Sequence, residues 1–399
     1  MIKVDLVYSG FINAPNGASR FVKLMSTLKE RFNSSGVDLR VISQDTISPT
    51  REICESKSFS NKGNKRGVMI ERLARYSLTL TWYLLNRRYF GPVKRIADYY
   101  IEKPDDGKGD IIALQEFYTC YYFLKNRKST KQKVYLTLHN DGLIWPMLYD
   151  RYPRFKSHFF DGFRSRVMKN ILGGCDRILF VADHARIAFC KNNPSFPASH
   201  TSFVYNGIDE KELAKMPGSK DDVISFICVG TLCDRKNQMG ILRAISKLPV
   251  SVQNKIKMVF VGDGSIRAEM ENYSKGLNCV VDFVGNSNKV DYYLQQADCF
   301  ILFSKVEGLP ISIIEGMRAA LPIIGSRVAG IPEQINDGKS GYIVDLDEEA
   351  LAQVINKVVF DGKDKLRLMG EESYRLFRDK FTIQSMCQKY IEEYKVLFK

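Results

Sequence analysis

The sequence predicts an α/β protein with two Rossmann-like domains, each built on a doubly wound parallel sheet. The chain has 399 residues, and at roughly 100 to 200 residues per domain this length favours two domains over one. Short apolar runs alternate with helical stretches along most of the chain. Such runs are typical of strands that are buried on both faces of a parallel sheet.

The first half begins with a strand–helix–strand unit. A strand at residues 3–9 (KVDLVYS) leads into a loop with Pro15, Asn16 and Gly17. A helical pattern over residues 20–32 and a second strand at 38–43 follow it. Further strands of this domain are expected at 110–115, 133–139 and 177–182.

The second half shows the same alternation more clearly. Six apolar runs, VISFICVG, KIKMVFVG, VVDFVG, CFILFS, LPIIGS and GYIVD, are separated by helical stretches between residues 223 and 345. The join between the domains is expected near Tyr205 to Ser219. We therefore predict a first domain over residues 1–205, a second over 206–380 and a closing carboxyl-terminal helix over 381–399.

The composition excludes several classes of protein. With 45% hydrophobic, 26% charged and 12% aromatic residues, the chain resembles an ordinary globular protein. No apolar run approaches the roughly 18 residues that a membrane-spanning helix needs. The first residues, MIKVDLVYSG, lack the features of a secretory signal, which favours a cytoplasmic location. The nine cysteines form no CxxC pair, so we expect reduced thiols and no metal site.

The net positive charge of the chain lies entirely in the first half. Residues 1–200 carry 33 Lys and Arg against 18 Asp and Glu, a net +15, whereas residues 201–399 carry 26 against 27, a net −1. This asymmetry indicates a polyanionic partner, either nucleic acid or an anionic membrane surface, unless it only keeps a solvated face soluble. No nucleic-acid-binding motif is present, so the membrane is favoured and no nucleic-acid partner is expected.

Basic residues cluster at residues 57–66, 87–95 and 151–171. In the third cluster Phe155, Phe159 and Phe163 recur at spacings of four among basic side chains. This pattern predicts a basic amphipathic helix, which either lies on a membrane surface or packs its aromatic stripe on the core.

Candidate chemical residues follow the predicted strands. In an open parallel sheet, ligands bind beyond the carboxyl ends of the strands. His139, Lys236 and the segment 307–315 occupy such positions. The segment EGLPISIIEGM places Glu307 before a helix that should begin near Pro310, with Glu315 inside it.

The start of that helix is suited to an anionic ligand. Its free backbone N–H groups form a site for a diphosphate, and Gly308 allows the backbone to approach closely. One of the two carboxylates can then accept hydrogen bonds from hydroxyl groups of a sugar and the other from those of a ribose. For an isolated pair of glutamates eight residues apart, two solvent-facing charges would be the simpler interpretation.

The surrounding motifs strengthen the functional interpretation. From Phe226 to Asp345 the chain closely resembles the retaining group 1 (family 4) glycosyltransferases, which have the GT-B fold of two Rossmann-like domains facing a cleft. The matching segments are VGTLCDRKNQ, FVGDGSIRAEME, FVGNSNKVDYYLQQADCFILFSKVEGLPISIIEGMRAALPII and AGIPEQINDGKSGYIV, with weaker matches at NGASRFV, LTLHN and VYNGID.

The resemblance implies roles for the donor-site residues. Glu307 would hold hydroxyls of the donor sugar, Glu315 would bind the ribose, and Lys236 would neutralise the diphosphate as it leaves. Many family members have an arginine where this chain has Thr231, and Arg235 either compensates for it or forms a surface salt bridge. The backbone of Gly308, Leu309 and Pro310 would complete the donor site.

Two residues of the first domain are also implicated by the resemblance. Gly17 corresponds to a loop whose backbone approaches the diphosphate or the acceptor, although Ala18 stands where the family often has a second glycine. His139 would lie near the donor sugar and the reacting phosphate, where it orients and stabilises without acting as a nucleophile.

The resemblance predicts a cytoplasmic enzyme, with a possible peripheral position on the inner face of the membrane. It would transfer a sugar from a nucleotide-diphosphate-sugar to a polysaccharide or lipid-linked oligosaccharide, with retention of configuration, no obligatory metal and no cofactor. The alternatives are a nucleotide-sugar epimerase or hydrolase on the same fold, and a non-catalytic protein that binds nucleotide and membrane.

Overall fold

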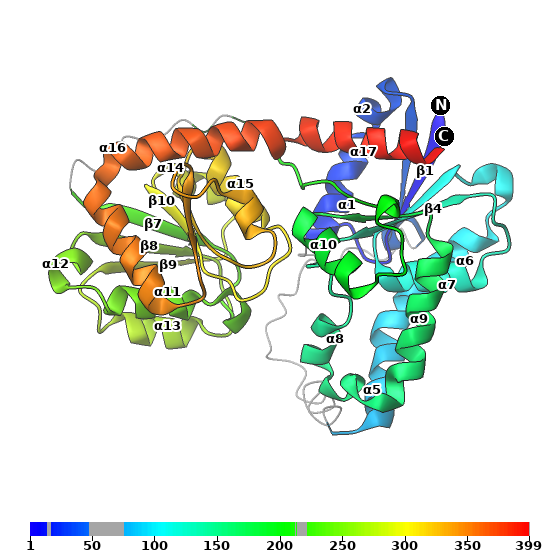
Figure 1. Ribbon diagram of the computed structural model, residues 1–399, viewed down its shortest axis with the longest axis horizontal. Coiled ribbons are helices and arrows are strands. Elements are labelled where there is room, and N and C mark those ends of the chain that lie inside the picture. Colours follow the sequence, from blue (N-terminus) through cyan, green and yellow to red (C-terminus); the bar gives the residue numbers. More distant parts are fainter. Residues whose placement is uncertain (14–16, 48–75, 212, 214–221, 399) are drawn as a thin grey trace. The chain divides into compact units, whose positions relative to one another are not determined.

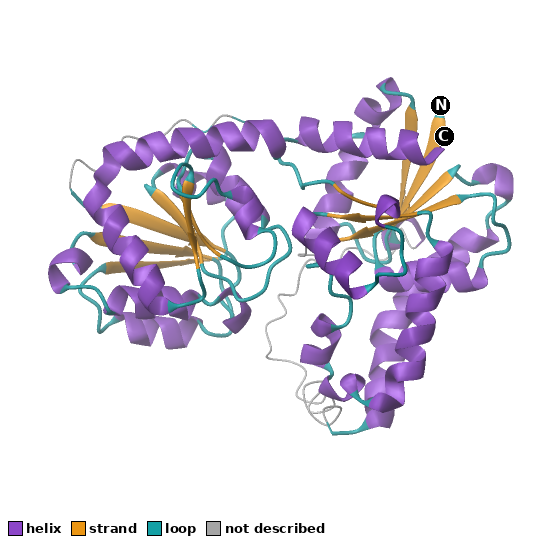
Figure 2. Ribbon diagram, viewed as in Figure 1, coloured by secondary structure: helices purple, strands orange, loops and turns teal. Residues whose placement is uncertain are grey.

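The computed structural model describes residues 1–13, 17–47, 76–211, 213 and 222–398, and it divides into two units (Figure 1). The first unit comprises Met1–Val181, Arg186–Val204 and Cys387–Lys399. The second comprises Ala182–Ala185 and Tyr205–Met386. In each unit a sheet of strands is covered by helices on both faces (Figure 2). The predicted α/β class with two parallel sheets is therefore confirmed.

The sheet of the first unit has six parallel strands in the order β2-β1-β3-β4-β5-β6. Its interior strands read as nearly continuous apolar runs because helices cover both faces. The last strand has only three residues and escapes detection from the sequence for that reason. The strands are β1 (Ile2–Val7), β2 (Val37–Ile42), β3 (Ile111–Leu114), β4 (Lys133–Leu138), β5 (Arg177–Phe180) and β6 (Thr201–Phe203).

The helical pattern predicted over residues 20–32 is two helices instead of one. The chain breaks at Leu28, whose φ of −99° and ψ of 9° lie outside the helical range. This break lets Phe32 become fully buried beside β2. The main helices of this unit are α1 (Gly17–Thr27), α2 (Lys29–Ser34), α5 (Leu78–Leu85), α6 (Gly91–Glu102), α7 (Phe117–Asn126), α9 (Asp161–Gly174) and, from Arg186 onward, α10 (Asp183–Asn192).

A helical extension at one end of the first unit has an apolar core of its own. The turn η1 (Asn86–Phe90) joins α5 to α6, and α8 (Pro146–Arg151) leads into the short turns η3 (Pro153–Lys156) and η4 (His158–Phe160) before α9. Figure 1 shows α5 and α8 away from the sheet, and α9 running from this extension back towards the sheet. The core of this extension consists of Leu84, Leu85, Leu148, Tyr152, Phe155 and Phe160.

The prediction of a single amphipathic helix over residues 151–171 is wrong. Pro153 and the extended backbone of Ser157, with ψ of 147°, break the segment into η3 and η4 before α9 begins. The phenylalanines consequently do not form one stripe. Phe155 is fully buried, Phe163 is partly buried against the core, and Phe159 is 71% exposed.

The second unit has the sheet order β12-β11-β10-β7-β8-β9, again all parallel. All six predicted strands are present. They are β7 (Ile224–Val229), β8 (Ile256–Val261), β9 (Val280–Gly285), β10 (Cys299–Leu302), β11 (Ile323–Ser326) and β12 (Gly341–Val344). The helices are α11 (Gln238–Ser246), α12 (Val250–Gln253), α13 (Arg267–Ser274), α14 (Val290–Gln295), α15 (Ile311–Arg318) and α16 (Glu348–Lys380).

The last helix, α17 (Ile383–Phe398), belongs to the first unit from Cys387 onward. Tyr390 and Tyr394 are buried in that unit. The ring of Tyr390 lies 5.6 Å from Phe21, and the ring of Tyr394 lies 5.3 Å from Tyr135. The end of the chain therefore completes the core of the domain in which the chain begins.

One feature expected from the sequence, the basic cluster at residues 57–66, lies outside the described residues. Within the described residues, no helix is long and apolar enough to cross a membrane.

Candidate active site

Glu307, the first of the two carboxylates that the sequence indicates, lies between β10 and α15. Glu307 follows the buried strand β10, and its residue is only 8% exposed. Pro310 is the N-cap of α15, with β-region angles, so the helix begins one residue later. No side chain caps the helix start, which leaves its first N–H groups for a ligand or solvent.

Two neighbouring contacts hold this segment in place. Gly330 N–H donates to the carbonyl oxygen of Gly308 at 3.0 Å. The amide Nε2 of the fully buried Gln334 donates to the carbonyl oxygen of Pro310 at 3.1 Å. Since Leu309 is 5% exposed, the segment presents its backbone and not its apolar side chain to a ligand.

Lys236 comes from the loop that follows β7. The loop forms the short turn η6 (Asp234–Lys236), and Asn237 then adopts a left-handed conformation with φ of 54° before α11. Gln238 is fully buried and fastens this loop. It donates to the carbonyl oxygen of Thr231 at 2.9 Å and accepts from Cys233 N–H at 3.3 Å.

Lys236 and Glu307 form a close, largely buried ion pair. Lys236 Nζ lies 2.6 Å from Glu307 Oε1, and the two side chains are only 12% and 7% exposed. Arg235 Nη1 lies 3.5 Å from the same oxygen, but the side chain of Arg235 is 51% exposed. The carboxylate is thus flanked by two cations, one buried and one at the surface.

The loop of Arg235 is tied to the loop of Glu307. Arg235 Nη1 donates to the carbonyl oxygen of Val306 at 2.8 Å, and Lys305 N–H donates to the carbonyl oxygen of Arg235 at 2.8 Å. Lys305 Nζ also pairs with Asp234 at 2.7 Å. The loops after β7 and β10 therefore act as one rigid platform, with neighbouring strands as its support.

The buried thiol of Cys228 lies near the Lys236–Glu307 pair. Burial raises the pKa of Cys228 to about 12; the nearby Lys236 lowers this pKa and the nearby Glu307 raises it. Cys228 is therefore a protonated, unreactive residue of β7, and its packing supports the charged pair. Glu315 lies on α15, is partly exposed and makes an interaction of its own.

His139 lies in the first unit, at the carboxyl end of β4. Its Nε2 lies 3.1 Å from Gln115 Oε1, and its ring centroid is 4.9 Å from that of Phe21 in α1. Burial lowers the pKa of His139 to about 4. The imidazole is therefore neutral at physiological pH and offers hydrogen bonding instead of positive charge.

Gly17 is the first residue of α1, the helix that carries Phe21. The loop before it, residues 14–16, lies outside the described part of the chain. The structure thus associates Gly17 and His139 with the carboxyl edge of the first sheet, and it brings Arg235, Lys236, Glu307 and the start of α15 together at the carboxyl edge of the second.

Sequence reasoning missed three polar residues of these sites. Gln115 follows β3 and contacts His139, Glu116 accepts hydrogen bonds from Ser9 N–H and from Thr119, and Gln238 fastens the loop of Lys236. Gln115 and Glu116 directly follow a strand, so the rule that led to His139 also applies to them. Gln238 carries no such signal because its role depends on burial.

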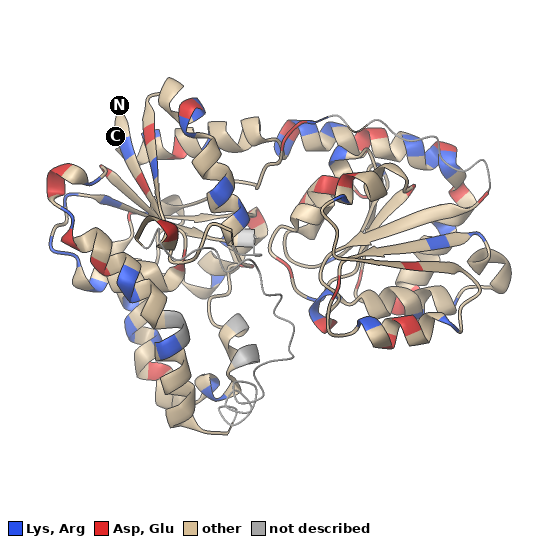
Figure 3. Cartoon of the chain, turned by 180° about the vertical axis from the view of Figure 1, so that it is seen from behind, with Lys and Arg blue, Asp and Glu red and all other residues tan. Residues whose placement is uncertain are grey.

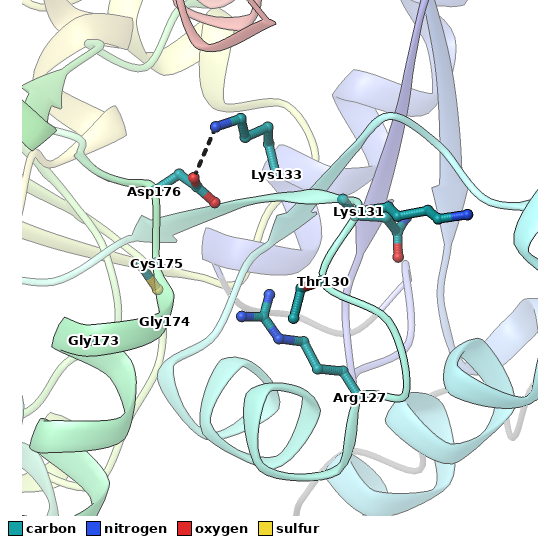
Figure 4. A pocket seen from close by; sticks show the side chains of 9 residues that line it. Arg127, Thr130, Lys131, Lys133, Gly173, Gly174, Cys175 and Asp176 are labelled. Atoms are coloured by element: carbon teal, nitrogen blue, oxygen red, sulfur yellow. Dashed lines mark hydrogen bonds and ion pairs between the residues drawn. The ribbon is translucent and has the colours of Figure 1, made fainter.

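A pocket of about 390 Å³ lies at the opposite edge of the first sheet (Figure 4). It is lined by residues that precede β4 and β5, among them Arg127, Lys131, Lys133 and Asp176. The helices α7 and α9 end there, so their partial negative charges face the basic side chains. This pocket lies away from the carboxyl ends of the strands and is distinct from the candidate active site.

Within the described part of the chain, no group of three or more His, Cys, Asp or Glu residues is arranged to hold a metal ion. The eight described cysteines are free thiols. The sulfur atoms of Cys120 and Cys175 lie 3.3 Å apart, a contact that the sequence did not indicate.

Two parallel-sheet units with a basic and acidic pair after neighbouring strands agree with the GT-B architecture that the sequence motifs predict, and the comparisons with known proteins identify the family. The model of the group 1 glycosyl transferases matches residues 209–375. The model of glycosyltransferase family 4 matches residues 15–212. The chain therefore belongs to the group 1 glycosyltransferases, as its motifs predicted.

Curated relatives show the same family. An N-acetyl-D-galactosaminyltransferase of Campylobacter jejuni that acts on an undecaprenol-diphosphate-linked glycan is 34% identical over 39% of this chain and 44% of its own length. The N-acetyl-α-D-glucosaminyl L-malate synthase of Bacillus anthracis is 27% identical over 51% of this chain and 54% of its own length. The chain thus aligns with about half of the length of each of these two relatives.

Solved structures share the fold over nearly the whole chain. Anabaena HepE in complex with UDP superposes with a TM-score of 0.68 at 15% identity and covers 99% of this chain and 100% of its own. The sucrose-phosphate synthase of Thermosynechococcus elongatus superposes with a TM-score of 0.70 at 18% identity and covers 100% and 99%. At this identity the likeness establishes the fold alone.

Proposed function

We propose that the protein is a retaining glycosyltransferase that moves a sugar from a nucleotide-diphosphate-sugar to a polysaccharide or a lipid-linked oligosaccharide. The buried Lys236–Glu307 pair beside the start of α15 carries this proposal. It supplies a cation for a diphosphate and a carboxylate for sugar hydroxyls within one rigid platform.

The charged residues of the donor site would change partners when the donor binds. In the free protein Lys236 is neutralised by Glu307. A bound diphosphate would attract Lys236 and the N–H groups at the start of α15, and Glu307 would then be free to accept hydrogen bonds from the sugar. Glu315, further along α15, would accept the ribose hydroxyls. Structures of HepE with UDP and with UDP-glucose support a donor of this class.

Retention would follow from attack on the face from which the diphosphate departs. The bond between the sugar and the diphosphate would be largely broken, leaving an oxocarbenium-like sugar. The acceptor oxygen would bond to that face as its hydroxyl proton passes to an oxygen of the departing diphosphate. Lys236, Arg235 and the start of α15 would stabilise the negative charge that builds on the leaving group. Because these groups supply positive charge, we propose that the reaction needs no obligatory metal and no cofactor.

His139 would act by hydrogen bonding near the reacting centre. As a neutral imidazole it orients a sugar hydroxyl or a phosphate oxygen without competing with Lys236 for the charge of the leaving group. Gly17, at the start of α1, would bring backbone N–H groups close to the diphosphate or the acceptor.

The acceptor class is suggested by the relatives. The Campylobacter jejuni relative acts on an undecaprenol-diphosphate-linked glycan, and other relatives are O-antigen and lipopolysaccharide glycosyltransferases. An acceptor of this kind lies on a membrane surface. We accordingly place the enzyme in the cytoplasm, at the inner face of the membrane, where the basic first half meets anionic lipid.

Two other functions remain as candidates from the sequence. An epimerase or hydrolase on the same fold would consume the donor without an acceptor, and a non-catalytic protein would bind the nucleotide without turnover. We favour transfer over simple binding because the chain has the whole set of residues that the family resemblance implicates, namely Glu307, Glu315, Lys236 and His139.

Product analysis tests the proposal. A panel of nucleotide-diphosphate-sugars is first screened by thermal shift, and the stabilising donor is then incubated with undecaprenol-linked glycans. The expected product is a glycoside whose anomeric configuration by NMR equals that of the donor. An inverted product overturns retention, free sugar or an epimerised donor indicates the alternative enzymes, and donor binding without any turnover indicates the binding protein.

A further inference from the structure

We propose that the outer end of the helical extension in the first unit binds the surface of a lipid bilayer with anionic headgroups. The surface is named the tip patch and consists of exposed aromatic and basic side chains from α5, η1, η3 and η4. Its members are Trp82, Tyr83, Arg87, Arg154, Lys156 and Phe159. The proposal deepens the peripheral membrane location by assigning residues to the contact.

The aromatic members are exposed side chains of α5 and η4. Trp82, Tyr83 and Phe159 are 38%, 52% and 71% exposed. The ring of Trp82 lies 6.1 Å from that of Phe160, and the ring of Phe159 lies 5.1 Å from the same ring. Trp82 and Phe159, which are far apart in the sequence, therefore both pack against Phe160 in the apolar core of the extension.

Basic side chains accompany these rings. Arg87 donates from Nη1 to the hydroxyl of Tyr83 at 3.0 Å, and Arg154 and Lys156 are exposed on η3, against which α5 packs. Asp161, the acidic residue at the start of α9, is already paired with Arg164 and with His158. Among the described side chains, no carboxylate pairs with Arg87, Arg154 or Lys156.

This chemistry matches a bilayer surface. Tyr and Trp favour the boundary between headgroups and acyl chains, because their rings are apolar and their polar atoms stay hydrated. Lys and Arg next to them remain at the level of anionic headgroups. Figure 3 shows Lys and Arg along the helices of this extension. An anionic bilayer complements both components, and it is where a lipid-linked acceptor would be found.

Vesicle sedimentation of the full chain tests the tip patch. Vesicles are made of phosphatidylcholine alone or of equal parts phosphatidylcholine and phosphatidylglycerol. The wild-type chain should bind the anionic vesicles and not the neutral ones. Arg154→Glu/Lys156→Glu should weaken binding at least about tenfold at low salt, and Tyr83→Ala/Phe159→Ala should remove the binding that persists at high salt.

Matched variants in the second unit control for exposure and charge. Tyr292 and Phe360 are 47% and 91% exposed, so Tyr292→Ala/Phe360→Ala removes comparable rings elsewhere. Lys275 and Lys380 are exposed, so Lys275→Glu/Lys380→Glu matches the charge change. Equal losses in test and control variants, or no binding by the wild type, overturn the proposal. Association of the chain with itself through the tip patch, seen by light scattering, overturns it as well.

The result is independent of the proposed transfer reaction. Sedimentation needs no sugar donor, and the patch variants should retain wild-type transfer to a water-soluble acceptor analogue. Loss of vesicle binding with retained transfer supports the patch. Vesicle binding by a chain that lacks transfer leaves the patch intact and contradicts only the proposed function.

A separate observation identifies a positioning residue for His139. We infer that Gln115 holds the neutral imidazole in the form with its proton on Nε2. Gln115 Nε2 lies 3.3 Å from the carbonyl oxygen of Ala113 and 3.4 Å from Thr137 Oγ1. A carbonyl oxygen only accepts hydrogen bonds, so the NH₂ group of Gln115 must face Ala113.

The orientation of Gln115 determines the tautomer. With its NH₂ group committed, Gln115 presents Oε1, an acceptor, to His139 Nε2 at 3.1 Å. Nε2 must therefore carry the proton, and Nδ1 keeps its lone pair. His139 then offers an acceptor at Nδ1, which suits a sugar hydroxyl and not an anionic phosphate oxygen. The candidate role of His139 is thereby narrowed to the sugar.

Nitrogen NMR of the full chain, with ¹⁵N-labelled histidine, tests this inference. The chain has four histidines, and comparison with His139→Asn assigns the signal. At neutral pH the Nε2 of His139 should show the shift of a protonated nitrogen and Nδ1 that of an unprotonated one. The reverse pattern in the wild type overturns the inference. In a folded Gln115→Leu variant, the preference for the tautomer with its proton on Nε2 should weaken. If that preference is unchanged, another group sets the tautomer and the inference is overturned.

Discussion

The Lys236–Glu307 pair is the residue-scale feature on which the donor site depends. Two opposite charges are held 2.6 Å apart with little exposure. Such burial is costly unless each charge is satisfied. The pair is therefore expected to contribute little to the stability of the fold. It suits ligand binding instead, because an incoming diphosphate can bind Lys236 and the sugar can bind Glu307.

Substitution of either partner should impair transfer. Glu307→Gln removes the acceptor charge for sugar hydroxyls, and Lys236→Ala removes the cation for the diphosphate. Each should lower kcat/KM about tenfold to a thousandfold, while circular dichroism shows a retained fold. A folded variant with wild-type kcat/KM would contradict the donor-site assignment. Lys305→Ala, which alters a 45%-exposed cation of the same platform, is the matched control.

His139 should make stability depend on pH. Burial lowers its pKa from 6.5 to about 4, so the unfolded chain takes up a proton within that window and the folded chain does not. The free energy of unfolding contributed by this residue therefore falls as pH drops from 6.5 towards 4 and is constant below. In urea denaturation, His139→Gln should lose less stability than the wild type over this window. Parallel pH profiles would refute the expectation.

At the scale of elements, the helical extension shows how one segment serves two purposes. η3 and η4 turn Phe155 inward and leave Phe159 in solvent. The same short stretch thus supplies core packing to the extension and an aromatic ring to its surface. A continuous helix with spacings of four would have placed both rings on one face.

This division predicts opposite outcomes for two similar substitutions. Phe155→Ala removes a fully buried ring and should cost about 3 to 5 kcal/mol, seen as a lower Tm. Phe159→Ala removes a ring that is 71% exposed and should leave Tm nearly unchanged. Calorimetry of both variants provides the comparison. A large loss of Tm in Phe159→Ala would show that the ring is part of the core in solution.

At the scale of the whole molecule, charge and chemistry are separated between the halves. The first half carries the net +15 and the tip patch, and the second carries the donor platform with a net −1. A surface that attracts an anionic bilayer and a site that binds an anionic donor therefore do not compete for the same cations.

Chelation should have little effect on the enzyme. In the proposed mechanism Lys236, Arg235 and the start of α15 supply the positive charge that a metal supplies elsewhere. Activity in excess EDTA should stay close to that of the untreated enzyme in a continuous assay of nucleotide release. Complete loss with EDTA, restored by manganese, would show that a metal takes part and that the cations of the platform are insufficient.

Much of this protein could be read directly from the sequence. Buried parallel strands are continuous apolar runs, so the two sheets were predictable, and β10, Glu307 and the start of α15 follow one another within a few residues. Local rules about strand ends, proline at a helix start and glycine at close approaches apply to such neighbours. The family motifs then supplied the chemistry expected at each position.

Tertiary structure decided what depends on distant contacts. The pairing of Lys236 with Glu307, the orientation of His139 by Gln115 and the burial of Tyr394 in the first unit each join segments that are far apart in the chain. The inward turn of Phe155 and the exposure of Phe159 depend on the break at Pro153 and Ser157 and on the core beneath them. Sequence patterns report the period of one segment, whereas burial and hydrogen bonding are set by whichever segments pack against it.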